Sequence, residues 1–401
     1  MYGFRKPYTA ATYEGASFWG IDYKFLLIIS QTAGYVIAKW AGIKIVSEVR
    51  PSRRIVLLIF LLCFAESMLL LFGVIPRPWN IACLFLNGLP LGVVFGLVLG
   101  CLEGKRNTEA LIAGLCASFI VSDGVSKSVG TWLLDMGVGE GWMPFLSGMV
   151  FAVPTVLFVA MLSKVPPPSE SDVASRSERK PMRGRARRRF FMRYAPGLAG
   201  VTIVYLFVTL LRSIRADFAP ELWRDLGYSQ TPAVFTQSEL LVSLGVVLVS
   251  AMTVLIGHHY RAFMISLVTS LFGFVILLLC VKGWHAGWIG SFGFMVLLGL
   301  GVYIPYVAIH TTIFERMIAI TREKANIGFL MYLVDSVGYT GYILLMLMKY
   351  LMPPSGSILR LFIPCCLFLG VAGVVLNIFS ILWFTKKFRR HAYRVNGFAR
   401  G

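Results

Sequence analysis

Charged residues are scarce in this sequence. They make up 14% of its 401 residues, whereas roughly 25% is usual in soluble domains. Hydrophobic residues reach 57%, against roughly 45–50% in an average soluble chain. So little charge does not cover the surface of a soluble domain, and so many apolar side chains exclude intrinsic disorder. The composition therefore predicts a multi-pass membrane protein in contact with the lipid bilayer.

Signatures of enzymes and of bound metals are also absent. The sequence has no Walker A loop, no HExxH motif and no nucleophile elbow, so we expect neither an enzyme nor a nucleotide-driven pump. None of its seven cysteines has the spacing of a metal centre, so we expect no metal and no cofactor. The net charge of +19 lies mainly in short segments between apolar runs. We attribute it to membrane topology and expect no nucleic-acid partner.

Apolar runs long enough to cross a bilayer, about 20 residues each, occur along the whole chain. They are roughly 24–47, 54–75, 79–102, 108–134, 142–163, 195–219, 232–257, 261–281, 286–313, 326–350 and 359–385. Their period is not that of strands, so we expect eleven helices and an all-α, polytopic fold. Residues 1–22 are too short and too polar to span alone. We expect residues 1–16 to be the second half of an incomplete first helix.

The longest polar segment, 164–193, carries ten Lys or Arg residues and is typical of a flexible linker. It separates an N-terminal helical bundle, 1–163, from a C-terminal six-helix bundle, 194–385, which a basic tail, 386–401, follows. The loops on the side of the linker and tail hold 25 basic residues, and the alternate loops hold about six. By the positive-inside rule we expect the linker and the C-terminus in the cytoplasm, and the protein in the inner (plasma) membrane.

The two halves share residues at a nearly constant offset. Arg5 lies 207 residues before Arg212, and Asp123 lies 212 residues before Asp335. A glutamate stands 20 residues before each of these aspartates, at Glu103 and Glu315. The pattern indicates a duplicated six-helix unit, which is the architecture of transporters whose site lies between the repeats, near the middle of the membrane.

Charges inside the predicted spans mark candidate functional positions, because they are costly in lipid. Arg212 stands more than two turns inside its helix, too deep to reach the membrane surface, and Arg5 corresponds to it in the first half. Two guanidinium groups facing one cavity repel each other unless an anion lies between them, and their planar fork suits phosphate or carboxylate. The pattern therefore favours an anion site. The alternative is neutralisation by neighbouring acids, for example of Arg212 by Glu239 or of Arg215 by Asp217.

Other charged residues leave two interpretations open. Asp123 and Lys127 are four residues apart on one helix face, so they either pair with each other or contact a substrate. Asp335 has no basic neighbour at that spacing, so it is either a proton carrier or a hydrogen-bonded structural residue. Lys39 is expected to extend to the cytoplasmic surface, and Glu66 to pair with a neighbouring helix. The predicted substrate-site residues are Arg5, Lys6, Tyr35, Asp123, Lys127, Arg212, Tyr303 and His310, and Asp335 and Glu239 are the candidates for ion coupling.

Four segments resemble the major facilitator superfamily, and in particular its organophosphate:phosphate antiporter branch. They are YGFRKPYTAATY, AKWAGIKIVSEVRPSRR, IVYLFVTLLRSIRADFAPELW and LGLGVYIPYVAIHTTIFE. By these matches Arg5 and Arg212 are the two phosphate-binding arginines of the branch. Where the fifth helix of the branch has a substrate-site histidine, this sequence reads SDGVSKSVG, with Asp123 and Lys127. This departure implies a different pocket and suggests an outlying bacterial subgroup.

The resemblance implies two six-helix bundles and a secondary transporter working by alternating access. We expect its substrate to be a small organic anion, namely an organophosphate, phosphate or a carboxylate, and we expect a monomer. One alternative is a non-transporting receptor or sensor with the same fold, which would engage a cytoplasmic partner through the linker or the tail. Another is an exporter of amphipathic compounds. The buried arginines argue against neutral drugs as its substrates.

Overall fold

A computed structural model describes residues 1–49, 53–102, 108–166, 184–228, 232–321, 327–350 and 357–398. Within these ranges, eleven helices are long and apolar enough to cross a membrane, and each falls on one of the predicted apolar runs. The strands of this described part form a single small hairpin, β1 (Ser17–Phe18) with β2 (Ile21–Asp22). The prediction of an all-α, multi-pass membrane protein is confirmed.

The helices follow the chain in two groups. The first contains the short 3₁₀ turns η1 (Tyr2–Phe4) and η2 (Pro7–Ala10), then α1 (Tyr23–Glu48), α2 (Arg54–Val74), α3 (Ile81–Leu102), α4 (Thr108–Asp135) and α5 (Met143–Ser163). The second contains α7 (Gly184–Asp217), α8 (Ala219–Asp225), α9 (Pro232–Val254), α10 (His259–His285), α11 (Ser291–Ala308), the π-helical turn η4 (Ile309–Ile313), α12 (Phe314–Thr321), α13 (Ile327–Tyr350) and α14 (Ile358–Phe398).

Three boundaries differ from the prediction. Residues 1–16 form two 3₁₀ turns and not a stretch of α-helix, because Pro7 lacks a backbone donor and disfavours the α conformation before it. The predicted linker is helical from Gly184, where an Arg-rich run of good helix formers begins α7. Residues 167–183 of that linker lie outside the described ranges. Helix α14 continues to Phe398, through most of the predicted tail.

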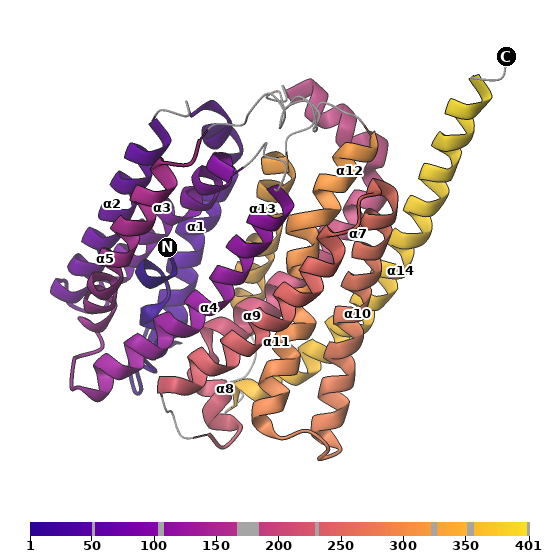
Figure 1. Cartoon of the computed structure of the whole chain (residues 1–401). Helices are drawn as coiled ribbons and strands as arrows, with labels where there is room; N and C mark the ends of the chain where they lie inside the picture. Colours follow the sequence, from indigo (N-terminus) through magenta and orange to yellow (C-terminus); the bar gives the residue numbers. More distant parts are fainter. Residues whose placement is uncertain are drawn as a thin grey trace.

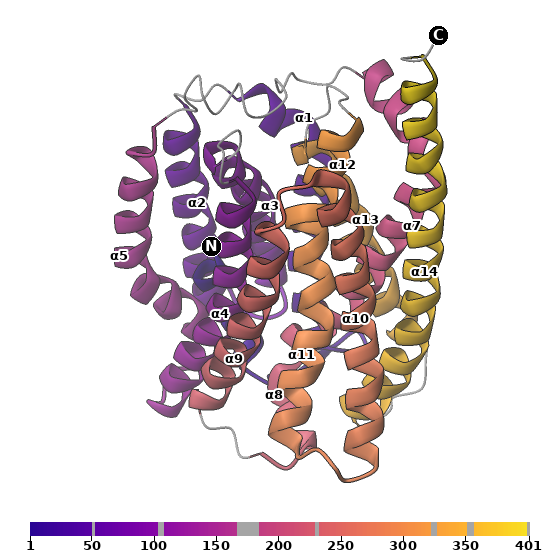
Figure 2. The same ribbon diagram turned by 45° about the vertical axis from the view of Figure 1, so that its right-hand side comes forward.

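Each group packs mainly within itself, and two helix pairs form the largest contacts between the groups. Helix α1 packs on α3, α2 on α3 and α5, α10 on α11 and α14, and α7 on α13 and α14. Figure 1 places α2, α3 and α5 at one side and α7, α10 and α14 at the other, and Figure 2 gives the same order after a turn. Between the groups, α1 packs on α13 and α4 packs on α9. We call this boundary the seam.

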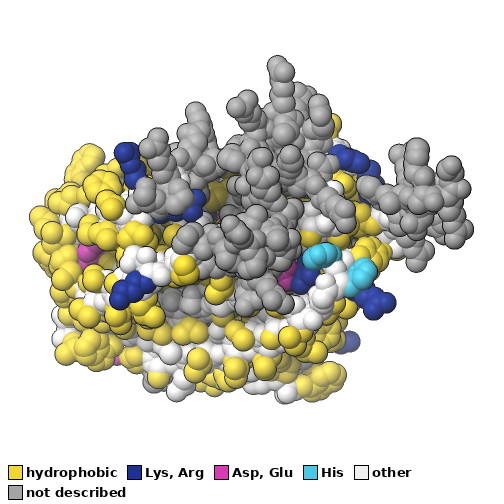
Figure 3. Space-filling view, turned by 45° about the horizontal axis from the view of Figure 1, so that its top comes forward, with side chains coloured by type: hydrophobic (Ala, Val, Ile, Leu, Met, Phe, Trp, Pro, Cys, Tyr) yellow, Lys and Arg dark blue, Asp and Glu magenta, His cyan; other side chains and the backbone are white. Residues whose placement is uncertain are grey.

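The outer surface of the helices suits a lipid environment. Large apolar side chains are exposed along the helices, with Val153, Leu255 and Phe368 among the most exposed. Figure 3, in which the upper face of Figure 1 is turned forward, shows apolar side chains along the sides, with Lys and Arg side chains mainly on the face turned forward. Apolar sides with charged ends are the distribution expected of a protein that crosses a bilayer.

Glycines allow α1 and α3 to approach until their backbones touch. A Cβ atom at Gly34 would lie 2.1 Å from the carbonyl oxygen of Phe85, and one at Gly88 would lie 2.2 Å from that of Gln31. Small residues at such positions let membrane helices pack closely. This contact matters for the site described below, because α1 and α3 carry the amides that hold its N-terminal arginine.

Replacing Gly88 by alanine should force α1 away from α3. The added methyl group would meet backbone atoms, which have no rotamer by which to move aside. We expect the free energy of unfolding to fall by roughly 1–3 kcal/mol, seen as a lower midpoint of thermal unfolding of the purified protein. Gly114→Ala in α4 is the matched control, since nothing lies within 4 Å of its added Cβ. An equal loss in both variants would argue against close packing as the cause.

Candidate functional site

Two buried arginines meet at the seam around one tyrosine. Arg212 donates a hydrogen bond of 2.7 Å from Nη2 to the hydroxyl of Tyr339. The guanidinium carbon of Arg5 lies 3.8 Å from the ring centre of Tyr35 and 5.5 Å from that of Tyr339. That of Arg212 lies 4.7 Å from Tyr306 and 5.7 Å from Tyr339. We call these five residues the central site.

Neither guanidinium of the central site has an acidic partner among the residues that the structure describes. Arg5 is 3% exposed and Arg212 is 6% exposed, and the Nε atom of each has no hydrogen-bond partner there. Cation–π contacts stabilise both groups, but an aromatic ring does not cancel their charge. The central site is therefore a buried, uncompensated positive region.

The other buried cations near the seam are paired with acids. These pairs are Lys6 with Asp217, Lys24 with Glu221 at 2.6 Å, Lys39 with Asp335 at 2.7 Å, Lys127 with Asp123, Arg215 with Glu239 at 2.5 Å and Arg316 with Glu109 at 2.7 Å. Desolvated charges in proteins are normally paired in this way, because leaving one alone costs several kcal/mol. Arg5 and Arg212 depart from that rule together, which marks them as the position where an anion would be most favoured.

The backbone that carries Arg5 is held by buried amide side chains and not by a helix. Gln31 of α1 donates from Nε2 to the carbonyl oxygen of Arg5, at 2.9 Å, and to Oδ1 of Asn87, at 2.8 Å. Asn87 of α3 donates from Nδ2 to the carbonyl oxygens of Phe4, at 3.1 Å, and Ala65, at 2.9 Å. These bonds satisfy carbonyl groups that the 3₁₀ turns leave free, and they fix Arg5 against α1 and α3.

A second cluster adjoins the central site. Asp335 of α13 pairs with Lys39 of α1 across the seam and also accepts a hydrogen bond from the hydroxyl of Tyr205. Nε2 of His310 lies 3.7 Å from Oδ1 of the same aspartate. The His310 ring is stacked 4.6 Å from the ring of Tyr306. His310 lies in the π-helical turn η4, just after Pro305, and such π-bulges are frequent at functional sites.

The space between these groups is closed in this conformation. A cavity of about 10 Å³ remains, which is about the room of one water molecule. Its wall is formed by Met1, Tyr2, Tyr35, Lys39, Phe95, Phe119, Tyr306, Asp335 and Tyr339. An organic anion therefore needs the seam to open before it reaches the arginines.

The structure separates the predicted substrate-site residues into two sets. Arg5, Arg212 and Tyr35 belong to the central site, and His310 stacks beside it. Tyr303 packs edge-on against Tyr306, with 6.2 Å between ring centres, and is not part of the cavity wall.

The remaining predicted site residues are paired with one another or with other charged residues of the spans. Asp123 and Lys127 form an ion pair within α4, which is the first of the two interpretations left open. Lys6 pairs with Asp217. Glu239 pairs with Arg215, so the proposed neutralisation of Arg212 by Glu239 is not observed, nor is that of Arg215 by Asp217.

Two expectations about single charges are wrong, and two tyrosines were missed. Lys39 does not extend to the surface but is 1% exposed beside Asp335. Glu66 finds no partner in any described residue, and both of its carboxylate oxygens are buried. Tyr306 precedes His310 by four residues and Tyr339 follows Asp335 by four, a spacing that places each pair on one helix face. This spacing is the feature of the sequence by which both tyrosines could have been assigned to the site. Glu103, which took part in the repeat pattern, lies outside the described residues.

Arg212 and Arg215 allow a direct test of the missing partner, because they lie on the same helix three residues apart. Arg215→Met should lower the free energy of unfolding by roughly 3–5 kcal/mol, since it leaves the Glu239 carboxylate buried and unpaired. Arg212→Met should leave thermal unfolding unchanged or raise its midpoint, because it removes a buried charge that has no acid beside it. A comparable loss of stability in both variants would mean that Arg212 is neutralised after all.

Comparison with known proteins gives a family without an assigned activity. The sequence pattern of one family, described as a family of unknown function (DUF5690), matches residues 7–387. No curated protein matches the chain. The match covers 381 of the 401 residues, counted from 7 to 387, and includes the helices that carry Tyr35, Arg212, Tyr306 and Tyr339, whereas Arg5 lies two residues before it. The chain belongs to the DUF5690 family.

Proposed function

We propose that this multi-pass membrane protein is a secondary active transporter that moves a small organic anion by alternating access between two six-helix bundles of the major facilitator type. The observation that carries the proposal is the pair Arg5 and Arg212, buried at the seam without an acid beside either guanidinium among the described residues. Planar guanidinium groups bind phosphate and carboxylate oxygens in pairs. An organophosphate, phosphate or a carboxylate would supply the missing negative charge.

The packing at the seam supports a duplicated architecture. The sequence offset relates α4, which carries Asp123, to α13, which carries Asp335. A similar offset relates α1, with Gln31, to α9, with Ser238. The contact of α1 with α13 is therefore the counterpart of the contact of α9 with α4, and both form the seam. Repeats joined by a pair of equivalent contacts are the arrangement in which transporters rock around a central site.

Ion pairs at both ends of the seam fit a cycle of alternating opening. Helix α12, which lies at the upper end in Figure 1, carries Arg316, and Arg316 pairs with Glu109 of α4. Helix α8, which lies at the lower end, carries Glu221, and Glu221 pairs with Lys24 of α1. Each pair joins one helix group to the other, so opening one end breaks one pair and leaves the other intact. This would give the central site access to one side of the membrane at a time.

The topology and location are part of the same proposal. Basic residues gather in the linker, the tail and the loops on one side, which supports a cytoplasmic position for these segments and the inner (plasma) membrane for the protein. We expect the chain to act as a monomer without a cofactor.

Ligand-induced stabilisation tests the anion site directly. Purified protein would be heated with phosphate, sugar phosphates, glycerol phosphate, carboxylates and neutral sugars in parallel. We expect one class of anion to raise the midpoint of unfolding, because a ligand at 100 times its dissociation constant adds about 2.7 kcal/mol. Arg212→Lys keeps the charge but loses the fork, so the shift should shrink or vanish there.

Arg224→Lys is the matched control, since Arg224 is exposed and pairs with Glu14 at the molecular edge. It should respond to the anion as the unmodified protein does. Absence of any shift with every anion, or an unchanged shift in Arg212→Lys, would contradict the proposed site.

Of the two acids considered for ion coupling, Asp335 and Glu239, Asp335 is the better candidate for coupling transport to protons. Asp335 lies in the wall of the central cavity, where its partner Lys39 also lies. Glu239 is held by Arg215 and is not part of that wall. A proton on Asp335 would release Lys39 toward a bound anion, and His310, at 3.7 Å, is placed to pass that proton.

Asp335→Asn should therefore make transport independent of the proton gradient. In liposomes, uptake of the stabilising anion should lose its dependence on an imposed pH difference, while the anion still raises the unfolding midpoint of the purified variant. Glu140→Gln, near the surface beside Arg77, should keep the dependence. If wild-type uptake ignores the pH difference, Asp335 has no coupling role.

A further inference from the structure

A long groove runs along the outside of the first helix group, between α2 and α5. Its volume is about 640 Å³, which lies within the range of small-molecule sites. The lining extends from Ile55 to Leu70 on α2 and from Phe145 to Ser163 on α5, with Phe4 at its inner wall. At 1.5 Å per residue the α2 side is about 22 Å long. The groove is therefore elongated along the membrane normal and separate from the central site.

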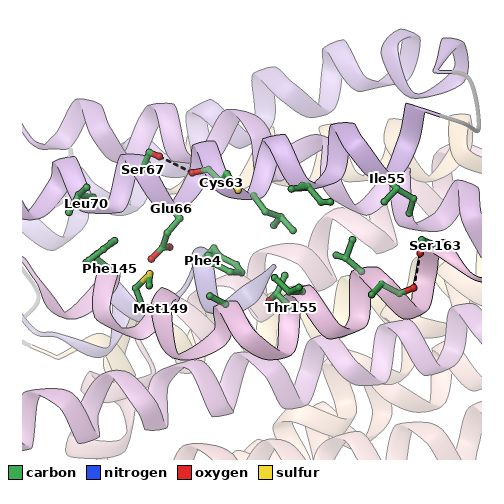
Figure 4. A pocket seen from close by; sticks show the side chains of 16 residues that line it. Phe4, Ile55, Cys63, Glu66, Ser67, Leu70, Phe145, Met149, Thr155 and Ser163 are labelled. Carbon is green, nitrogen blue, oxygen red and sulfur yellow. Dashed lines mark hydrogen bonds between the residues drawn. The ribbon is translucent and has the colours of Figure 1, made fainter.

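One charged side chain projects into this apolar groove. Glu66 stands 12 residues from the first residue of α2 and 8 from the last, hence near the middle of the span. Figure 4 shows it pointing from α2 toward α5, between Phe145, Met149 and Phe4. Both carboxylate oxygens are buried and have no hydrogen-bond partner in the part of the chain that the structure describes.

The groove makes room for this carboxylate, but no described residue donates a hydrogen bond to it. A Cβ atom at Gly148 of α5 would lie 2.1 Å from Oε2 of Glu66, so only glycine leaves the space. The hydroxyls of Ser67 and Ser163 donate to carbonyl oxygens of their own helices, at 2.9 Å and 2.7 Å. An ionised acid in such surroundings is costly unless a cation meets it or a proton neutralises it. A cationic ligand would supply the charge that the described residues do not.

We propose that the groove between α2 and α5 binds a cationic amphiphile, whose ammonium group pairs with Glu66 while its hydrocarbon part lies along the apolar lining. Charge complementarity selects this occupant over an uncharged acyl chain, which would fill the groove and leave the carboxylate alone. The site is independent of the proposed anion transport, because it uses none of the buried charges at the seam. Phe4 connects the two regions, since it lines the groove and precedes Arg5.

Binding of a permanently charged probe tests the proposal. The full chain in phosphatidylcholine nanodiscs would be titrated with radiolabelled dodecyltrimethylammonium, and with radiolabelled dodecanol as the uncharged probe of equal chain length. Binding to empty nanodiscs gives the background. We expect saturable binding of the cation, at least tenfold weaker in Glu66→Gln. Glu140→Gln, which removes an acid outside the groove, is the matched control and should bind as the unmodified protein does.

A blocking variant confirms the location. Ala152→Phe, on the α5 side of the groove, should remove the saturable binding of the cation while thermal unfolding remains cooperative. Three results would overturn the proposal. They are no saturable binding of the cation, equal binding to Glu66→Gln and the unmodified protein, or binding of dodecanol as tight as that of the cation. The last would mean that the groove holds ordinary hydrocarbon of the bilayer.

Discussion

Buried ion pairs whose two charges come from opposite sides of the seam decide how the two helix groups sit together. Lys39 with Asp335 and Lys6 with Asp217 are pairs of this kind, with each residue at most 7% exposed. Such pairs add little net stability when compared with apolar packing, but breaking one without replacement is costly. The seam therefore opens readily only where water or a ligand takes over the role of a lost partner. This constraint links the packing of the fold to any movement of a substrate.

Aromatic rings stabilise the two arginines that have no acidic partner among the described residues. A cation over a desolvated ring gains about 2 kcal/mol or more, and the rings of Tyr35, Tyr306 and Tyr339 surround Arg5 and Arg212. The tyrosines lower the cost of keeping both charges out of water. Because they carry no charge of their own, they leave the electrostatic attraction for an anion in place. Carboxylates in the same positions would have stabilised the fold and removed that attraction.

The sequence was sufficient for features that depend on local composition. A run of about 20 apolar residues is enough to specify a span, and the eleven spans follow from it. The depth of Arg212 in its helix marked it as a candidate site residue, and the spacing of Asp123 and Lys127 already offered their pairing as one of two interpretations. The conformation of residues 1–16 was misjudged because Pro7 was not weighed against the apolar character of its neighbours.

Features that depend on distant residues were beyond the sequence. Lys39 looked like a surface lysine because its partner, Asp335, is 296 residues away along the chain. The sequence around Arg5 did not indicate which amide side chains hold its backbone, since Gln31 and Asn87 belong to separate helices. Glu66 was expected to find a partner, as buried acids usually do, and only packing could reveal that it has none in the described part of the chain. In each case tertiary contacts decide which charge meets which.

The balance of charge at the seam explains why substrate binding and closure would be coupled. Six buried cations and four buried acids gather around the middle of the seam, an excess of two positive charges: Arg5, Lys6, Lys39, Lys127, Arg212 and Arg215 against Asp123, Asp217, Glu239 and Asp335. Closing the seam over this excess costs desolvation energy that the aromatic rings offset only in part. An anion between the guanidinium groups removes the excess. Since a ligand shifts an equilibrium only by its differential affinity, an anion that binds more tightly to the closed arrangement favours closure. A neutral solute of the same size would fill the same space without changing that balance.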